Sequence, residues 1–143
     1  MESIVVGVDN SEVSTRAVEF AADRSLRNDW KVVLVHVIPW SPYSFQTPSE
    51  NEHRHRQRTK EIEAAQDQII APMAAILDQA GVSHDDVIIH GRPSEAMIDL
   101  AKERGAVHII VGRTGDSGLR EAVFGSVASR LVQHAPVPVT VMP

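Results

Sequence analysis

Short segments rich in valine and isoleucine recur along the chain, and most are continuous rather than alternating with polar residues. That pattern is typical of strands buried on both faces of a parallel sheet. The expected strands are 4–8, 32–38, 87–89, 109–111 and 137–142. Between them lie segments with apolar residues at helical spacing. The predicted fold is therefore α/β, an open five-stranded parallel sheet with helices on both faces.

Residues that begin or end helices support this order. Asn10-Ser11 and Pro93 stand where the first and third helices should begin, and residues 49–52 form a capping-box pattern before the second. Gly81 and Gly105 stand where helices should end. Proline lacks a backbone N–H, so we expect Pro72 to kink or split the second helix, whose apolar stripe runs over 62–80.

Length and composition narrow the function classes. A chain of 143 residues with no detectable repeat predicts a single domain, 1–143. It has no cysteine, which excludes disulfides, a thiolate nucleophile and a cysteine zinc site. A net charge of −5 and only six aromatic residues argue against a nucleic-acid partner. Neither an export signal nor an apolar run of about 20 residues is present, so we expect a cytoplasmic protein without membrane insertion.

Glycines cluster after the fourth expected strand, at Gly112, Gly115, Gly118 and Gly125. Backbone N–H groups without a Cβ nearby, followed by a helix N-terminus that begins at Ser126, suit the binding of phosphate. Neither GxxxxGK[ST] nor GxGxxG occurs. From glycine content alone, a plain turn before an ordinary helix is an equal alternative.

The spacing of these residues supplies a more specific signal. Gly112-x2-Gly115-x9-Gly125-Ser126 resembles the nucleotide-binding signature of the universal stress protein family, G-2x-G-9x-G-[S/T]. Segments 4–11, 35–38, 91–93 and 135–139 are also similar to that family, so the resemblance covers about residues 2–142. It implies the strand order 3-2-1-4-5, in which Asp9 and Gly112 face one crevice beside the ends of strands 1 and 4.

Members with this signature bind ATP, and the resemblance implies a role for each matching residue. Asp9 is expected to contact the ribose, although it could instead be a turn residue that starts the first helix. The Val37 backbone would bind the adenine edge. The remaining residues with implied roles are Val111 and Gly112 beside the sugar and base, and Gly115, Gly125, Ser126 and Val127 at the phosphates. Arg113 departs from the family pattern; it could neutralise phosphate charge or simply be a solvated loop residue.

Several features stay open at this stage. Mg²⁺ is expected to accompany ATP, with Asp116 either an outer partner of the cation or a solvent-exposed residue. The bound nucleotide could also be AMP or ADP. Trp40, Tyr43 and Phe45 could form a flap over the base or pack elsewhere, and basic residues within 54–60 suit a solvated helix face. We expect no metal site built by the protein; His36 is predicted to be a packed, hydrogen-bonded residue, and His90 a loop residue.

The function that follows is an ATP-binding universal stress protein that acts as a nucleotide-responsive regulator toward an unidentified protein partner. ATP would order the 113–124 loop and the aromatic segment, which would change the surface offered to that partner. Two alternatives are a fold-only dimeric interaction module and a slow ATPase; catalysis is the less favoured, and no catalytic residue is assigned. The resemblance also implies a homodimer through the edge strand 137–142.

Overall fold

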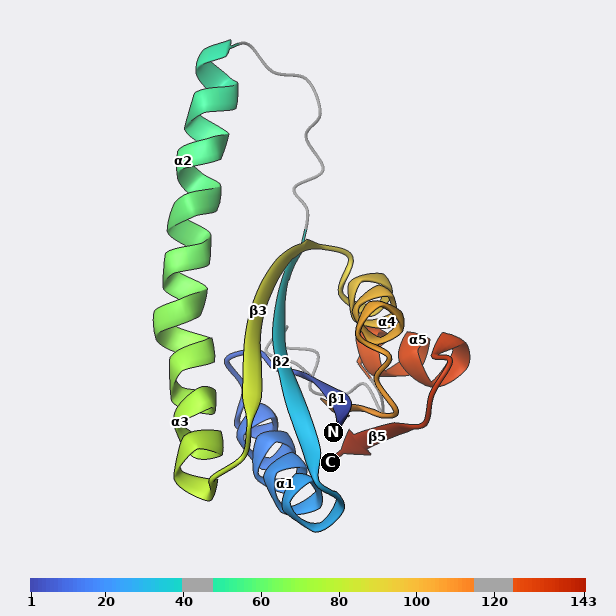
Figure 1. Ribbon diagram of the computed structural model, residues 1–143. Helices are drawn as coiled ribbons and strands as arrows, with labels where there is room; N and C mark the ends of the chain where they lie inside the picture. Colours follow the sequence, from blue (N-terminus) through green and yellow to red (C-terminus); the bar gives the residue numbers. More distant parts are fainter. Residues whose placement is uncertain (40–47, 115–124) are drawn as a thin grey trace.

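The computed structural model describes residues 1–39, 48–114 and 125–143. Strands and helices alternate along the chain as the apolar pattern predicts (Figure 1). The strands are β1 (Glu2–Gly7), β2 (Trp30–Pro39), β3 (His84–Gly91), β4 (Ile109–Gly112) and β5 (Val139–Met142). The helices are α1 (Glu12–Asn28), α2 (Pro48–Ala65), the π-helical turn η1 (Gln66–Ile70), α3 (Ala71–Ala80), α4 (Pro93–Arg104) and α5 (Ser126–His134).

The five strands form one parallel sheet in the order β3-β2-β1-β4-β5, which confirms the expected topology. β1 pairs with β2 as far as Gly7↔Val35, but with β4 only at Val5↔Ile109 and Val6↔Ile110. The neighbouring strands β1 and β4 are followed by helices on opposite faces of the sheet, α1 on one and α5 on the other. In open α/β sheets ligands bind outside the carboxyl ends of strands at such a point.

Helices cover both faces of the sheet, as predicted (Figure 1). Side chains of a strand alternate between its faces, so Val6 and Leu34 pack toward α1 and α3. Val5 and Val33 pack toward α4 and α5. All four are fully buried, which explains why these strands read as continuous apolar runs. Within the described residues, no helix combines the length and the apolar character needed to cross a bilayer.

The expected split at Pro72 is present in part, because the α-helix is interrupted by a π-helical turn just before the proline, which lies in the first turn of α3. α2, η1 and α3 follow one another as a continuous rod (Figure 1). A π-helical turn precedes the proline, and the Ala71 N–H donates to the Gln66 carbonyl, five residues back. The extra residue in that turn rotates the side chains of α2 about the helix axis, away from the apolar stripe expected over 62–80. Ile62, predicted to lie on the stripe, is accordingly 41% exposed.

The helix ends agree with the sequence except at α2. Gly81 and Gly105 end α3 and α4 with φ of +74° and +60°, a left-handed conformation that glycine adopts without strain. Pro93 begins α4, and Ser11 occupies the N-cap position of α1. The capping box at 49–52 is wrong, since α2 already begins at Pro48 and Ser49 lies inside the helix.

A charged cluster ties the edge strand β3 to α3. The His84 ring nitrogens lie 2.7 Å from a carboxylate oxygen of Asp78 and 2.7 Å from one of Asp86. Burial lowers the pKa of His84, but the hydrogen bonds and negative charges of Asp78 and Asp86 outweigh it, so that the pKa is raised above its usual value. The imidazolium form is thus stabilised by folding.

This raised pKa predicts a pH-dependent stability. The contribution of His84 is fully present below its unfolded pKa and is lost as pH rises through the higher folded pKa. We expect the wild-type advantage over His84→Gln to fall by about 0.5–1 kcal/mol between pH 6 and pH 8.5, a small value because Asp78 is exposed. Urea unfolding of both proteins at the two pH values measures it. A constant difference between the two proteins would contradict the assignment.

Candidate functional site

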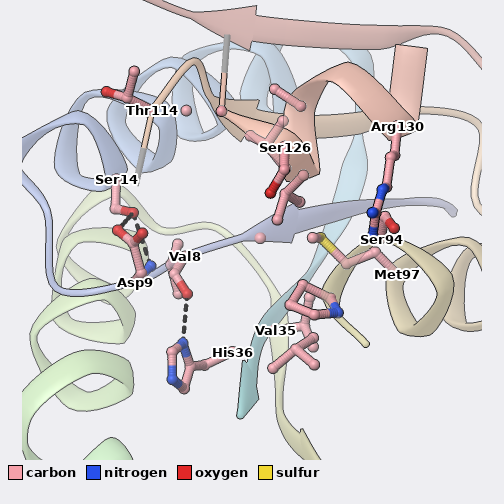
Figure 2. A pocket seen from close by; sticks show the side chains of 18 of the residues that line it. Val8, Asp9, Ser14, Val35, His36, Ser94, Met97, Thr114, Ser126 and Arg130 are labelled. Atoms are coloured by element: carbon pink, nitrogen blue, oxygen red, sulfur yellow. Dashed lines mark hydrogen bonds between the residues drawn. The ribbon is translucent and has the colours of Figure 1, made fainter. Parts of the chain in front are cut away.

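A cavity of about 430 Å³ opens at the carboxyl ends of β1, β2 and β4. Figure 2 shows its walls. Ser14 at the start of α1 and Asp9 after β1 lie on one side, Ser94 and Met97 of α4 lie on the other, and α5 closes the cavity between them. The cavity thus occupies the place where the strand order predicts a ligand. Among the residues described, its charged lining side chains are Asp9 and Arg130.

Two glycines allow the walls to approach one another. A Cβ on Gly112 would lie 2.6 Å from Cγ1 of Val13, in the first turn of α1. A Cβ on Gly7 would lie 2.4 Å from Sδ of Met97, in α4. Both distances are too short for real side chains. Glycine at the ends of β1 and β4 therefore permits α1 and α4 to pack close to the sheet edge, where they frame the cavity.

Asp9 is fixed by the turn between β1 and α1. Its Oδ1 accepts hydrogen bonds from the Ser11 backbone N–H at 3.0 Å, from the Ser14 hydroxyl at 2.9 Å and from the Ser11 hydroxyl. The Asp9 N–H in turn donates to the Ser14 hydroxyl oxygen at 2.9 Å. The carboxylate is therefore held in one orientation at the cavity wall. Its role as a turn residue, open in the sequence, is visible in the structure and does not exclude contact with a ligand.

The N-terminus of α5 faces the cavity through Gly125, Ser126 and Val127. The Gly125 N–H donates to the Arg113 carbonyl at 2.7 Å, and the Arg113 N–H donates to the Met142 carbonyl at 2.6 Å. These bonds anchor the start of α5 beside the end of β4. The first intrahelical bond of α5 runs from the Ser129 N–H to the Gly125 carbonyl. The N–H groups of Ser126, Val127 and Ala128 therefore have no acceptor within the helix and suit an anion, which the positive end of the helix dipole also favours.

Val37 lies beyond the last residue of β2 that pairs with β1. Val35 faces β1, because its carbonyl accepts a hydrogen bond from the Val8 N–H at 2.9 Å. Backbone direction repeats every second residue in a strand, so the N–H and C=O of Val37 point to the same side, past the last pair Gly7↔Val35. This edge offers one donor and one acceptor close together, a suitable pattern for the edge of a base.

The other predicted site residues fall into three groups. Val111 and Gly112, at the end of β4, line the cavity with Asp9, Val37, Gly125, Ser126 and Val127. Arg113 is exposed, and its side chain is not among those that line the cavity. Gly115, Asp116 and Gly118 lie outside the described residues, as do Trp40, Tyr43 and Phe45. The expected ordering of the 113–124 loop therefore concerns a segment that is almost entirely outside the described part of the chain.

Sequence reasoning missed several lining residues, chiefly Ser14, Ser94, Met97 and Arg130. Met97 and Arg130 stand at ordinary helical positions, so only the packing of α4 against α5 brings them to the cavity. Ser94 had a usable signal, since it follows the Gly91-Arg92-Pro93 turn at the carboxyl end of β3. Ser14 likewise lies within one helical turn of Asp9.

The histidines behave differently from one another. His36 is half-buried and lines the cavity, and its Nδ1 lies 2.7 Å from the Val8 carbonyl, to which it donates a hydrogen bond (Figure 2). The predicted hydrogen bond is present, but His36 borders the site rather than the interior. His90 lies in β3, with Nε2 3.3 Å from Glu61 of α2, so the loop assignment is wrong. No cluster of three metal-ligating side chains occurs in the parts of the chain that the structure describes.

The chain is similar to known proteins in sequence and in fold. The model of the universal stress protein family matches residues 1–143. A universal stress protein of Methanocaldococcus jannaschii is 26% identical over 141 residues, which covers 99% of this chain and 81% of the relative.

Solved structures share the fold. UspA of Lactobacillus plantarum superposes with a TM-score of 0.86 at 24% identity and covers 99% of this chain and 97% of its own. A universal stress protein of Archaeoglobus fulgidus in complex with dAMP gives a TM-score of 0.74 at 23% identity, covering 100% and 98%. A universal stress protein in complex with cAMP gives 0.70 at 22% identity, covering 99% and 96%. On its full-length match to the family model and its five-stranded topology, the chain belongs to the universal stress protein family.

Proposed function

We propose that this protein binds ATP in the cavity at the ends of β1 and β4 and acts as a nucleotide-responsive regulatory factor. The observation that carries the proposal is the convergence of Asp9, Gly112 and the N-terminus of α5 on one cavity at the topological switch point. A pocket that joins apolar strand ends to unpaired helix N–H groups suits a ligand with a flat base at one end and phosphates at the other. Relatives crystallised with dAMP and cAMP support an adenine nucleotide.

Each wall receives a part of the ligand in this proposal. The Val37 backbone binds the adenine edge, with Val111 beside the base and Gly112 beside the sugar. Asp9 accepts a hydrogen bond from a ribose hydroxyl. The phosphates lie against Gly125, Ser126 and Val127 at the start of α5, together with Gly115 and the Arg113 charge.

Mg²⁺ is proposed to enter with ATP. Among the lining side chains that the structure describes, Asp9 is the single carboxylate, and its Oδ1 is already engaged by Ser11 and Ser14. This donor set fits a cation held mainly by phosphates and water, which is how Mg²⁺ commonly binds beside nucleotides. When bound, Mg²⁺ would neutralise phosphate charge.

Calorimetric titration tests the proposal. With Mg²⁺ present, we expect saturable binding of ATP, ADP and AMP to the purified protein, and adenine nucleotide in the mass spectrum of a freshly purified, denatured sample. Ser126→Ala should weaken ATP binding about 3- to 10-fold, because one neutral hydrogen bond to a phosphate is lost. Ser129→Ala is the matched control: it lies on the same helix, but its hydroxyl accepts from Gln133. Absence of binding at millimolar nucleotide would refute the proposal.

The edge strand β5 supports a second proposal, a homodimer. Pro138 and Met142 turn their carbonyls toward β4, accepting from Ile109 and Arg113. By alternation, the peptide groups of Val139 and Val141 point away from the sheet, where a second copy could pair with them.

We expect sedimentation equilibrium to give twice the chain mass of 15.7 kDa, and Val141→Pro to shift the protein toward the monomer. This substitution removes an outward donor and leaves the β4 pairing intact. Val132→Thr, at an exposed position of α5, is the control. A monomeric wild-type protein would contradict the proposed dimer without affecting the ATP proposal.

A further inference from the structure

Ser94 and Arg130 form a polar wall of the cavity that the expected nucleotide contacts leave unused. Ser94 is the second residue of α4, and Arg130 lies in the second turn of α5. Both line the cavity. Figure 2 shows the Arg130 side chain extending from α5 toward Ser94, on the side of the cavity opposite Asp9 and Ser14.

Ser94 is buried without a partner. Only 5% of the residue is exposed, yet no hydrogen bond of its hydroxyl occurs within the described residues. Its Oγ is not among the fully buried side-chain atoms that lack a partner, so the hydroxyl remains open to the cavity that Ser94 lines. Because its surroundings include the cavity, a bound ligand can supply that partner.

The backbone around Ser94 presents further donors. The first intrahelical bond of α4 runs from the Ala96 N–H to the Arg92 carbonyl at 2.8 Å. The N–H groups of Ser94 and Glu95 therefore precede it and have no acceptor within the helix, while Pro93 has none to offer. The positive end of the α4 dipole lies at the same place. Buried hydroxyl, free N–H groups and dipole all favour an acceptor with negative charge.

Arg130 adds a full positive charge to this wall. It lies four residues after Ser126 on the same face of α5, and helical side chains lean toward the N-terminus of their helix. Its guanidinium makes no hydrogen bond or ion pair with any other part of the chain that the structure describes. The nearest carboxylate in sequence to Ser94, Glu95, is engaged with Arg92 at 3.5 Å and lines a separate hollow beside β3. The wall is therefore positive.

We infer that Ser94, the first turn of α4 and Arg130 form a second anion subsite, which binds a phosphoryl group across the cavity from Ser126. Two helix N-termini, those of α4 and α5, then face the same ligand. The phosphoryl group is either a distal phosphate of the bound nucleotide or a free phosphate ion. The first source rests on the proposed function; the second does not.

The test is calorimetric titration of adenosine, AMP, ATP and inorganic phosphate into wild type, Arg130→Gln, Ser94→Ala and a matched control. Arg27→Gln is the control, because it removes the same charge at the far end of α1, where Arg27 only meets Asp23 on the surface. If a distal phosphate occupies the subsite, Arg130→Gln weakens ATP binding about tenfold and Ser94→Ala about threefold, while adenosine is unaffected. Arg27→Gln should leave all four titrations unchanged.

A free phosphate ion gives a different pattern. Inorganic phosphate then binds wild type but not Arg130→Gln. The affinity for ATP is the same in wild type and in Arg130→Gln. Equal affinities of wild type and Arg130→Gln for both ATP and phosphate would overturn the subsite, as would a loss that adenosine shares. If wild type binds phosphate through Arg130 but no nucleotide, the subsite stands and the ATP proposal fails. If wild type binds neither, both fail.

Discussion

Asp9→Ala should weaken ATP binding about 10- to 100-fold and destabilise the fold by about 1–3 kcal/mol, the ranges expected when a charged hydrogen-bond acceptor is removed. Two consequences are expected because Asp9 has two roles. Its Oδ1 holds the Ser11 N–H and the Ser14 hydroxyl at the start of α1. Its charge also faces the cavity where the ribose is proposed to bind.

Asp9→Asn separates these roles. The amide oxygen can still accept from Ser11 and Ser14, so chemical unfolding should show a smaller loss of stability than for Asp9→Ala. Its binding of ATP should still be weaker than wild type, since a neutral acceptor holds a hydroxyl less strongly than a carboxylate. Asp23→Ala, an exposed position in the middle of α1, is the control for loss of an acidic group. Wild-type affinity in Asp9→Ala would show that this residue serves only the turn.

Gly112→Ala should also have a large effect on stability and nucleotide binding, and its cause is steric. The added Cβ would lie 2.6 Å from Val13 Cγ1 and 3.2 Å from the Thr114 carbonyl oxygen. Val13 is β-branched, buried and at the start of α1, so it has little freedom to move. We expect a loss of about 1–3 kcal/mol of unfolding free energy, together with weaker nucleotide binding, because α1 must withdraw from the end of β4.

A double substitution tests that mechanism. Val13→Ala alone removes buried methyl groups and should also destabilise the protein. In Val13→Ala/Gly112→Ala the collision disappears, so the double variant should be more stable than the sum of the two single effects predicts. Urea unfolding of the four proteins measures this coupling. Strict additivity would contradict the proposed contact between α1 and β4.

Much of the fold could be predicted from the sequence because its strands are buried on both faces. Val5 and Val6 pack on opposite sides of the sheet, and such runs have few alternatives to a parallel sheet covered by helices. The strand order came from the resemblance of the glycine spacing to a family, not from the apolar pattern. The π-helical turn before Pro72 was not predictable, since its effect on Ile62 appears only after the helix is packed.

The residues of the candidate site were likewise predictable from the sequence only in part. Asp9 and Gly112 could be identified because they stand at the ends of expected strands, which the resemblance to a family implies are neighbours in the sheet. Arg130 could not, because its approach depends on how α5 lies against α4; Ser94 carried a signal only through its place after the turn at the end of β3. The resemblance therefore located one wall of the cavity, and the packing of the two helices supplied the other.

Amide chemical-shift mapping tests the central claim, the location of the nucleotide, most directly. ATP would be titrated with Mg²⁺ into uniformly ¹⁵N-labelled protein. The account predicts that the largest shifts fall on Asp9, Val37, Gly112 and the amides of 125–128, which line the cavity at the ends of β1, β2 and β4 and at the start of α5. Saturable binding with unchanged amides at these positions, and shifts elsewhere such as along α2, would contradict it.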